Sequence, residues 1–314
     1  MKASGHPLVT NQAQIITQQM VRVYQLCLDR VAARRAAVLF EGSSRTGKTC
    51  CSEFVAAHMR IQLPTVLVML HVARSRVARQ RQSVLKELCI SERILPQARG
   101  VDHLQHLLAY IESHVTGRSA PHCVLIVDEI QSWEPNDFHV LADLYNYLHL
   151  QGITLTLIGF AQPEIYERRN GLKAVEHYQI IARFFSEIIP FRGCQSVDEL
   201  ATILQACDTG SEFPSGSGVS YTAYFVPQAY AAGFRLVPLA ELFWNAFGDS
   251  VAGKYIKNLP MQHLRESIAC LLLLISPHDS ELLEADDKLV NEAVRRSGVG
   301  VFCDAIQERP ISSR

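Results

Sequence analysis

The octapeptide at residues 42–49, Gly-Ser-Ser-Arg-Thr-Gly-Lys-Thr, constrains this chain more than any other stretch. It fits the pattern G-x-x-x-x-G-K-T, lies after the apolar run 36–40 and precedes a helical pattern at 50–59. That strand–loop–helix context is the one in which this pattern forms a phosphate-binding P-loop. The alternative is a chance match in a turn that enters a helix. The residues expected to contact the nucleotide are Gly42, Ser43, Ser44, Arg45, Thr46, Gly47, Lys48 and Thr49.

The types of these residues follow from phosphate chemistry. Gly42 and Gly47 allow a tight backbone curl that directs N–H groups at phosphate oxygens. The start of the next helix adds partial positive charge. We expect Lys48 to reach the β- and γ-phosphates of ATP and the Thr49 hydroxyl to bind Mg²⁺.

Strand-like and helix-like segments alternate over the first two thirds of the chain. Apolar runs at 36–40, 65–72, 123–127, 153–159 and from 187 onward predict five strands with helices between them. Near-continuous apolar runs are typical of parallel strands that are buried on both faces. After residue 194 only helical patterns follow. We therefore expect an α/β fold with a five-stranded parallel sheet. The predicted parts are an N-terminal arm and helix (1–35, loose over 1–10), a nucleotide-binding domain (36–193) and a helical subdomain (194–314).

The third predicted strand ends in Asp128 and Glu129, which matches the Walker B pattern. We expect Asp128 to hold Mg²⁺ and Glu129 to activate the water that attacks the γ-phosphate. The alternative is a pair of acids that cap the next helix. Gln162 follows the fourth strand, at the edge where parallel sheets bind ligands. It is predicted to touch the γ-phosphate or the attacking water, or else to be an ordinary turn residue.

Arginines supply the remaining functional candidates. Arg183, just before the fifth strand, is predicted to reach the nucleotide of a neighbouring subunit as an arginine finger. Arg168 and Arg169 are weaker candidates, and a surface salt bridge is the alternative for each. A second group follows the second strand and is predicted either to contact DNA phosphates or to form a solvated face. This group comprises Arg74, Arg76, Arg79 and Arg81.

Composition limits the function classes. The 314-residue chain has a net charge of −1, so any contact with nucleic acid must come from a local basic patch. Its nine cysteines form no C-x-x-C pair, which favours reduced, buried thiols in the cytoplasm. We expect no membrane association, because no apolar run is long enough to span a bilayer and residues 1–19 do not read as a signal peptide.

Taken in order, the P-loop, Walker B motif, polar residue after the fourth strand and arginine before the fifth resemble AAA+ ATPases with a helical lid subdomain. Two phrases, 157–165 (Leu-Ile-Gly-Phe-Ala-Gln-Pro-Glu-Ile) and 259–264 (Leu-Pro-Met-Gln-His-Leu), are similar to transposition ATPases of the TnsC, TniB and MuB kind. The first also looks like ExeA-type secretion ATPases.

The resemblance implies an ATP- and Mg²⁺-dependent regulator. Such proteins assemble as rings or helical filaments on duplex DNA, recruit a transposase, work with target-selector proteins and disassemble on hydrolysis. Lys48, Thr49, Asp128 and Glu129 match directly, Gln162 takes the place of the first sensor, and Arg183 is the best match for the trans-acting arginine. Arg235 and Arg265 are both candidates for the second-sensor arginine.

Other functions stay open at this point. A helicase loader or a secretion-associated adaptor would use the same nucleotide site and act through protein partners. A P-loop phosphotransferase would also use it, although the Asp-Glu pair and the helical C-terminal region argue against that class.

Overall fold

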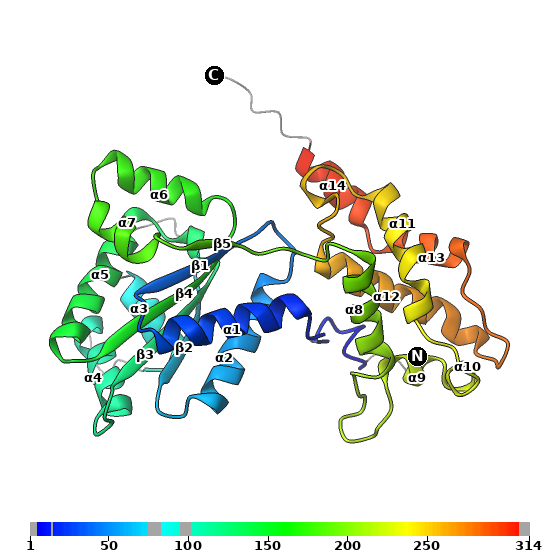
Figure 1. The fold of residues 1–314 in the computed structure, drawn as a ribbon, viewed down its shortest axis with the longest axis horizontal. Helices are drawn as coiled ribbons and strands as arrows, with labels where there is room; N and C mark the ends of the chain where they lie inside the picture. The colour runs from blue at the N-terminus through cyan, green and yellow to red at the C-terminus, as the bar shows by residue number, and fades with distance from the viewer. Residues whose placement is uncertain (1–4, 14, 75–82, 95–101, 308–314) are drawn as a thin grey trace. The chain divides into compact units, whose positions relative to one another are not determined.

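The computed structural model describes residues 5–13, 15–74, 83–94 and 102–307, and the chain divides into two compact units (Figure 1). The α/β unit comprises residues 20–43 and 48–191. The helical unit comprises residues up to 19, the P-loop apex 44–47, and residues from 192 onward.

A five-stranded parallel sheet forms the centre of the α/β unit, as predicted. Its strands lie in the order β2-β3-β4-β1-β5. β4 lies between β1 and β3, so the ends of these three strands are neighbours at one edge. The strand bounds are β1 (Ala37–Glu41), β2 (Leu67–Val72), β3 (His122–Asp128), β4 (Thr154–Ala161) and β5 (Ile188–Pro190).

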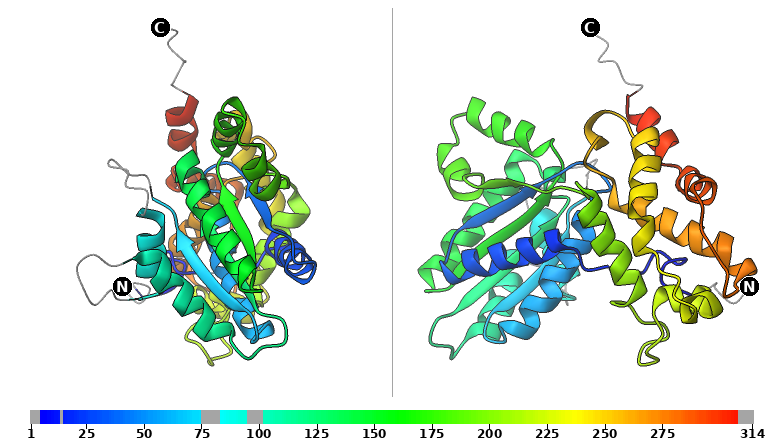
Figure 2. Two further views of the ribbon diagram at one scale, coloured as in Figure 1. Left: turned by 90° about the vertical axis from the view of Figure 1, so that its left-hand side faces the viewer. Right: turned by 45° about the vertical axis from the view of Figure 1, so that its right-hand side comes forward.

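Helices cover both faces of the sheet (Figure 2). The alternation of strand side chains explains this, because Val38 and Phe40 face one layer while Ala37 and Leu39 face the other. The first layer contains α1 (Gln18–Ala32) and α2 (Lys48–Gln62). Residues of the second layer come from α3 (Ser83–Ser91), α4 (His103–Val115), α5 (Pro135–Leu150), α6 (Ile165–Ala174) and α7 (Tyr178–Phe184).

The helical unit has a core of its own. It is built from α8 (Val197–Asp208), α9 (Tyr221–Phe225), α10 (Pro227–Ala231), α11 (Ala240–Ser250), α12 (Met261–Ile275), α13 (Asp287–Arg296) and α14 (Val299–Gln307). Asp208 is fully buried and accepts hydrogen bonds from the backbone N–H groups of Leu236 and Val237 and from the Thr222 hydroxyl. This carboxylate therefore ties the end of α8 to two later segments.

The N-terminal segment belongs to the helical unit, so the expectation of a loose arm is wrong for residues 5–10. His6 is completely buried among the rings of Phe213, Tyr221, Tyr224 and Phe225. Leu8 and Ala13 join the same core. The first helix begins at Gln18 and not near residue 11. A short segment with one His, one Leu and a Pro gave no periodic signal from which this packing could be predicted.

Two expectations from composition can be compared with the structure. All nine cysteines are free thiols, and seven of them are buried. No helix in the described part of the chain combines the length and apolar character needed to cross a membrane.

Candidate nucleotide site

The P-loop connects β1 to α2, and its glycines meet conformational and steric demands. Gly47 has φ +101°, a backbone region that glycine adopts without strain. At Gly42 a Cβ atom would lie 2.3 Å from the Phe191 carbonyl oxygen, so only glycine fits without a shift of the backbone. Arg45 also has a left-handed conformation, with φ +64°. These features form the sharp curl that the sequence motif predicts.

Lys48 opens α2 and is buried. Its Nζ donates hydrogen bonds to the carbonyl oxygens of Gly42 (2.7 Å) and Ser43 (2.8 Å). Burial lowers the pKa of Lys48, while the nearby carboxylates of Glu129 and Asp128 oppose that shift. The ammonium group is therefore held inside the curl of the loop, within reach of acidic groups that follow β3.

Asp128 ends β3 and is 1% exposed. Neither carboxylate oxygen accepts a hydrogen bond of good geometry from the described residues. Burial raises the pKa of this carboxyl, and the nearby Thr49 hydroxyl and Lys48 ammonium oppose the rise. A buried carboxylate with unsatisfied oxygens is costly unless a cation compensates it.

The donor set around Asp128 fits Mg²⁺. Asp128 and Thr49 would supply a carboxylate and a hydroxyl oxygen, which are the hard ligands this ion takes. Mg²⁺ usually keeps several waters and takes its other ligands from substrate phosphates, so two protein oxygens are sufficient.

Glu129 directly follows β3 and has a left-handed backbone with φ +54°. Its Oε2 accepts hydrogen bonds from the side-chain amides of Gln162 (3.0 Å) and Gln131. Gln131 also accepts a hydrogen bond from the backbone N–H of Gln162 through its Oε1, at 3.0 Å. Glu129 and the predicted sensor Gln162 are therefore joined in one hydrogen-bond network through Oε2 of Glu129.

Gln131 was not predicted from the sequence. It is 8% exposed and lies in the short helix η1 (Ile130–Ser132) that follows the Walker B pair. A polar side chain two residues after Glu129 was the only sequence signal for it. Arg168 holds the same segment, since its Nε donates to the Gln131 carbonyl (2.9 Å) and its Nη1 donates to the Glu134 carboxylate (3.3 Å).

The predicted arginines have partners within their own units. Arg183, in α7, donates to Asn146 Oδ1 (3.0 Å) and lies 4.4 Å from the centre of the Tyr145 ring. Arg169 stacks on Tyr166. Arg74 is exposed just after β2, whereas Arg76, Arg79 and Arg81 lie outside the described residues.

The P-loop apex, residues 44–47, makes its tertiary contacts within the helical unit. The Tyr255 hydroxyl donates to the Ser44 carbonyl (3.1 Å), and the backbone N–H of Gln262 donates to the Arg45 carbonyl (3.3 Å). Arg265 is one turn along α12 from Gln262 and is bound to Asn11. Arg235 instead stacks 3.6 Å from the centre of the Tyr230 ring.

Comparisons with known proteins agree with this geometry. Residues 32–168 match the family model described as an AAA domain. This chain has the AAA+ P-loop fold. The matched span contains the P-loop, the Walker B pair and Gln162, while residues from 192 onward lie beyond its end. No curated protein gives a significant match.

Solved structures share this AAA+ fold at low sequence identity. The Aeropyrum pernix ORC2 protein, solved in ADPNP–ADP complexes, is 13% identical with a TM-score of 0.59, over 89% of this chain and 67% of that one. The Aeropyrum pernix ORC1 protein in complex with DNA is 12% identical with a TM-score of 0.51, over 97% and 72%. Drosophila ORC bound to DNA is 13% identical with a TM-score of 0.51, over 94% and 64%.

Proposed function

We propose that this protein is a Mg²⁺-dependent ATPase whose nucleotide state controls its assembly on duplex DNA. The observation that carries the proposal is the convergence of four groups at one edge of the sheet. Lys48, the unsatisfied Asp128, and the linked pair Glu129 and Gln162 all follow the ends of adjacent strands.

The chemistry assigns one role to each group. Lys48 would neutralise charge on the β- and γ-phosphates, and Asp128 with Thr49 would hold Mg²⁺, which supplies further neutralisation when bound. Glu129 Oε1 would take the proton of the attacking water. Gln131 and Gln162, both donating to Oε2, fix the direction in which Oε1 points.

Assembly requires a group from a second copy of the chain. Arg183 is our candidate for the arginine that completes the transition state in trans. Its present partners are a neutral amide and an aromatic ring, so it can leave them without exposing an unpaired carboxylate. For the second sensor we favour Arg265 over Arg235, because Arg265 lies on the helix whose first turn contacts the P-loop apex.

DNA binding is supported by the relatives that were solved on DNA, Aeropyrum ORC1 and Drosophila ORC. The basic group Arg74, Arg76, Arg79 and Arg81 is the proposed contact surface, through phosphates and without sequence preference. The narrower proposal, a transposition regulator that recruits a transposase and responds to a target selector, depends on the phrases at 157–165 and 259–264. A replication initiator or helicase loader is the second candidate, which the ORC likeness favours.

The test is negative-stain imaging of the full chain with duplex DNA, with and without a slowly hydrolysed ATP analogue. Rings or filaments that need both DNA and nucleotide would support the proposal, while monomers under every condition would contradict it. Arg183→Ala should lower the DNA-stimulated ATP turnover by about 10³-fold, the effect expected for an arginine that acts in trans. Arg169→Ala, an arginine that also stacks on a tyrosine, is the matched control and should keep normal turnover.

A further inference from the structure

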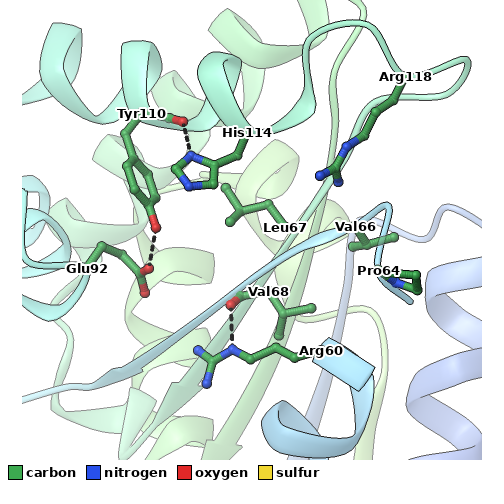
Figure 3. Close-up of a pocket in the computed structure, with 9 residues that line it drawn as sticks. All are labelled: Arg60, Pro64, Val66, Leu67, Val68, Glu92, Tyr110, His114 and Arg118. Carbon is green, nitrogen blue, oxygen red and sulfur yellow. Dashed lines mark hydrogen bonds between the residues drawn. The ribbon is translucent and has the colours of Figure 1, made fainter. Parts of the chain in front are cut away.

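A second polar pocket lies in the α/β unit, at the end of the sheet opposite the Walker motifs (Figure 3). It has a volume of about 400 Å³. Its walls come from the end of α2, the start of β2, helix α4 and the loop that leads into β3. Parallel strands place their amino ends together, so these segments meet although they are far apart in sequence.

Positive charge dominates this pocket. Arg60 and Arg118 border it on different sides, His114 adds an imidazole, and Glu92 is the single acid among the described residues of the lining. Glu92 already accepts a hydrogen bond from the Tyr110 hydroxyl at 2.9 Å. Burial, with this hydrogen bond, raises the pKa of Tyr110 to about 12, so the phenol stays a donor to Glu92 at neutral pH.

Both guanidinium groups have N–H donors that the described residues do not accept. Arg60 is exposed and donates from its Nε to the Val68 carbonyl at 3.1 Å, and no hydrogen bond from its terminal nitrogens is formed among the described residues. One terminal nitrogen of Arg118 is buried and has no hydrogen-bond partner among the described residues. None of the described carboxylates forms an ion pair with either arginine. A buried donor without an acceptor costs free energy, and an oxyanion would remove that cost.

A third guanidinium strengthens the positive field at this end of the sheet. Arg34 donates hydrogen bonds to the carbonyls of Ala120 (3.2 Å) and Pro121 (3.4 Å), in the loop that follows Arg118. Its charge also helps to lower the pKa of the neighbouring His122. Cations from three different parts of the chain, Arg34, Arg60 and Arg118, therefore gather at this end of the sheet.

The remaining walls are apolar and aromatic. Val66 and Leu67 line one side, and the rings of Tyr110 and His114 lie with their centres 4.2 Å apart. The volume exceeds what a bare phosphate ion fills and falls in the range typical of sites for small organic ligands. Planar guanidinium forks match phosphate oxygens in pairs.

We propose that this pocket binds the phosphate group of an organic phosphate, with Arg60 and Arg118 holding the oxyanion and the apolar wall contacting the organic part. The phosphate comes either from a free nucleotide or from the backbone of a nucleic acid. The site is independent of the P-loop, so it adds a second phosphate-binding position to the one in the proposed function.

The experiment uses the full chain with Lys48→Ala, which removes the main phosphate contact of the P-loop. Isothermal titration calorimetry with adenosine 5′-monophosphate and a short DNA duplex tests the two sources separately, and inorganic phosphate tests the oxyanion alone. We expect binding of at least one probe, weakened about 10-fold or more when Arg60→Ala and Arg118→Ala are added. The probe that loses affinity identifies the source. Arg22→Ala, at an exposed position on α1, is the matched control and should bind as before.

Thermal melting separates a binding role from a structural one. Since the buried nitrogen of Arg118 has no hydrogen-bond partner among the described residues, Arg118→Gln should leave the melting temperature without phosphate unchanged or higher. The proposal is overturned if none of the three probes binds, or if the added arginine substitutions leave every affinity unchanged. A melting temperature that falls in Arg118→Gln would also overturn it, because the arginine would then be structural.

Discussion

Strand β3 starts and ends with a buried ionisable residue, and the two ends differ in how they are satisfied. At the amino end, His122 Nε2 lies 3.0 Å from the Thr156 hydroxyl. That hydroxyl gives its own proton to the Arg35 carbonyl, so His122 is the donor. At the carboxyl end, Asp128 is as deeply buried, but its carboxylate accepts no hydrogen bond of good geometry from the described residues.

This difference indicates a structural role for His122 and a ligand-binding role for Asp128. Burial lowers the pKa of His122 to about 4, so the ring is neutral and part of a closed hydrogen-bond chain. Burial raises the pKa of Asp128, because the Thr49 hydroxyl and the Lys48 ammonium only partly offset the cost of removing the charged carboxylate from water. A satisfied buried group stabilises a fold, whereas an unsatisfied one marks a place where a ligand completes the site.

The largest expected effect tests the cation that faces the carboxyl end. Lys48→Ala removes the only lysine within the P-loop curl, so ATP affinity should fall by about 100-fold or more. Titration with a fluorescent ATP analogue measures this. Lys173→Ala, at an exposed position in α6, should bind nucleotide normally. Equal affinities for the two variants would remove the P-loop role.

The second prediction concerns the amino end and pH. The unfolded chain binds a proton at His122 near pH 6.5 but the folded chain only near pH 4, so stability falls as pH drops through that window. Between pH 7 and 5 the wild type should lose about 2 kcal/mol more unfolding free energy than His122→Gln, which can still donate to Thr156. Urea unfolding at both values measures the difference. Parallel losses would show that His122 is not held neutral.

The third prediction concerns the backbone at the carboxyl end of β1. Gly42→Ala should lower the unfolding free energy by about 2 kcal/mol, since its methyl group would collide with the Phe191 carbonyl. Gly171→Ala in α6 meets no atom within 4 Å and should be neutral or stabilising by roughly 0.5 kcal/mol. Equal unfolding free energies of the two variants in chemical denaturation would show that the close approach of Phe191 does not require glycine at position 42.

The smallest expected effect sharpens the contrast at Asp128. Because its folded pKa is raised, the folded state binds protons more readily than the unfolded state and stability falls as pH rises. Asp128→Asn should therefore raise the melting temperature without nucleotide, on the order of 2 °C at pH 8 and less at pH 5. Adding Mg²⁺ and ATP should stabilise the wild type but not the variant. A variant that melts lower at pH 8 without ligand would contradict this account of the carboxyl end.

The fold could be predicted from local sequence patterns. The strands were predictable because each is a short apolar run, and the segment 42–49 connects a strand to a helix as its motif predicts. The roles of the P-loop and Walker B residues in nucleotide binding stay predictions. Gln131 was missed because a single amide after Asp-Glu has no motif of its own. The left-handed backbone of Glu129 and the unsatisfied oxygens of Asp128 appear only once the sheet has formed.

Contacts between distant segments were not predictable. His6 looked like part of a polar arm, yet four aromatic rings from the helical unit surround it. Arg60 and Arg118 come to one pocket because β2 and β3 are neighbours, a pairing that no local pattern encodes. The start of α1 was misplaced for a related reason, since residues 5–13 pack with the helical unit and do not extend the helix.

The most direct test of the central claim is ATP turnover by the full chain as duplex DNA is added, for the wild type and Glu129→Gln. We predict that DNA raises wild-type turnover. Glu129→Gln should still bind ATP but should hydrolyse it at least about 100-fold more slowly than the wild type. Turnover that ignores DNA, together with undiminished hydrolysis by Glu129→Gln, would contradict the claim that this edge of the sheet is a DNA-responsive ATPase site.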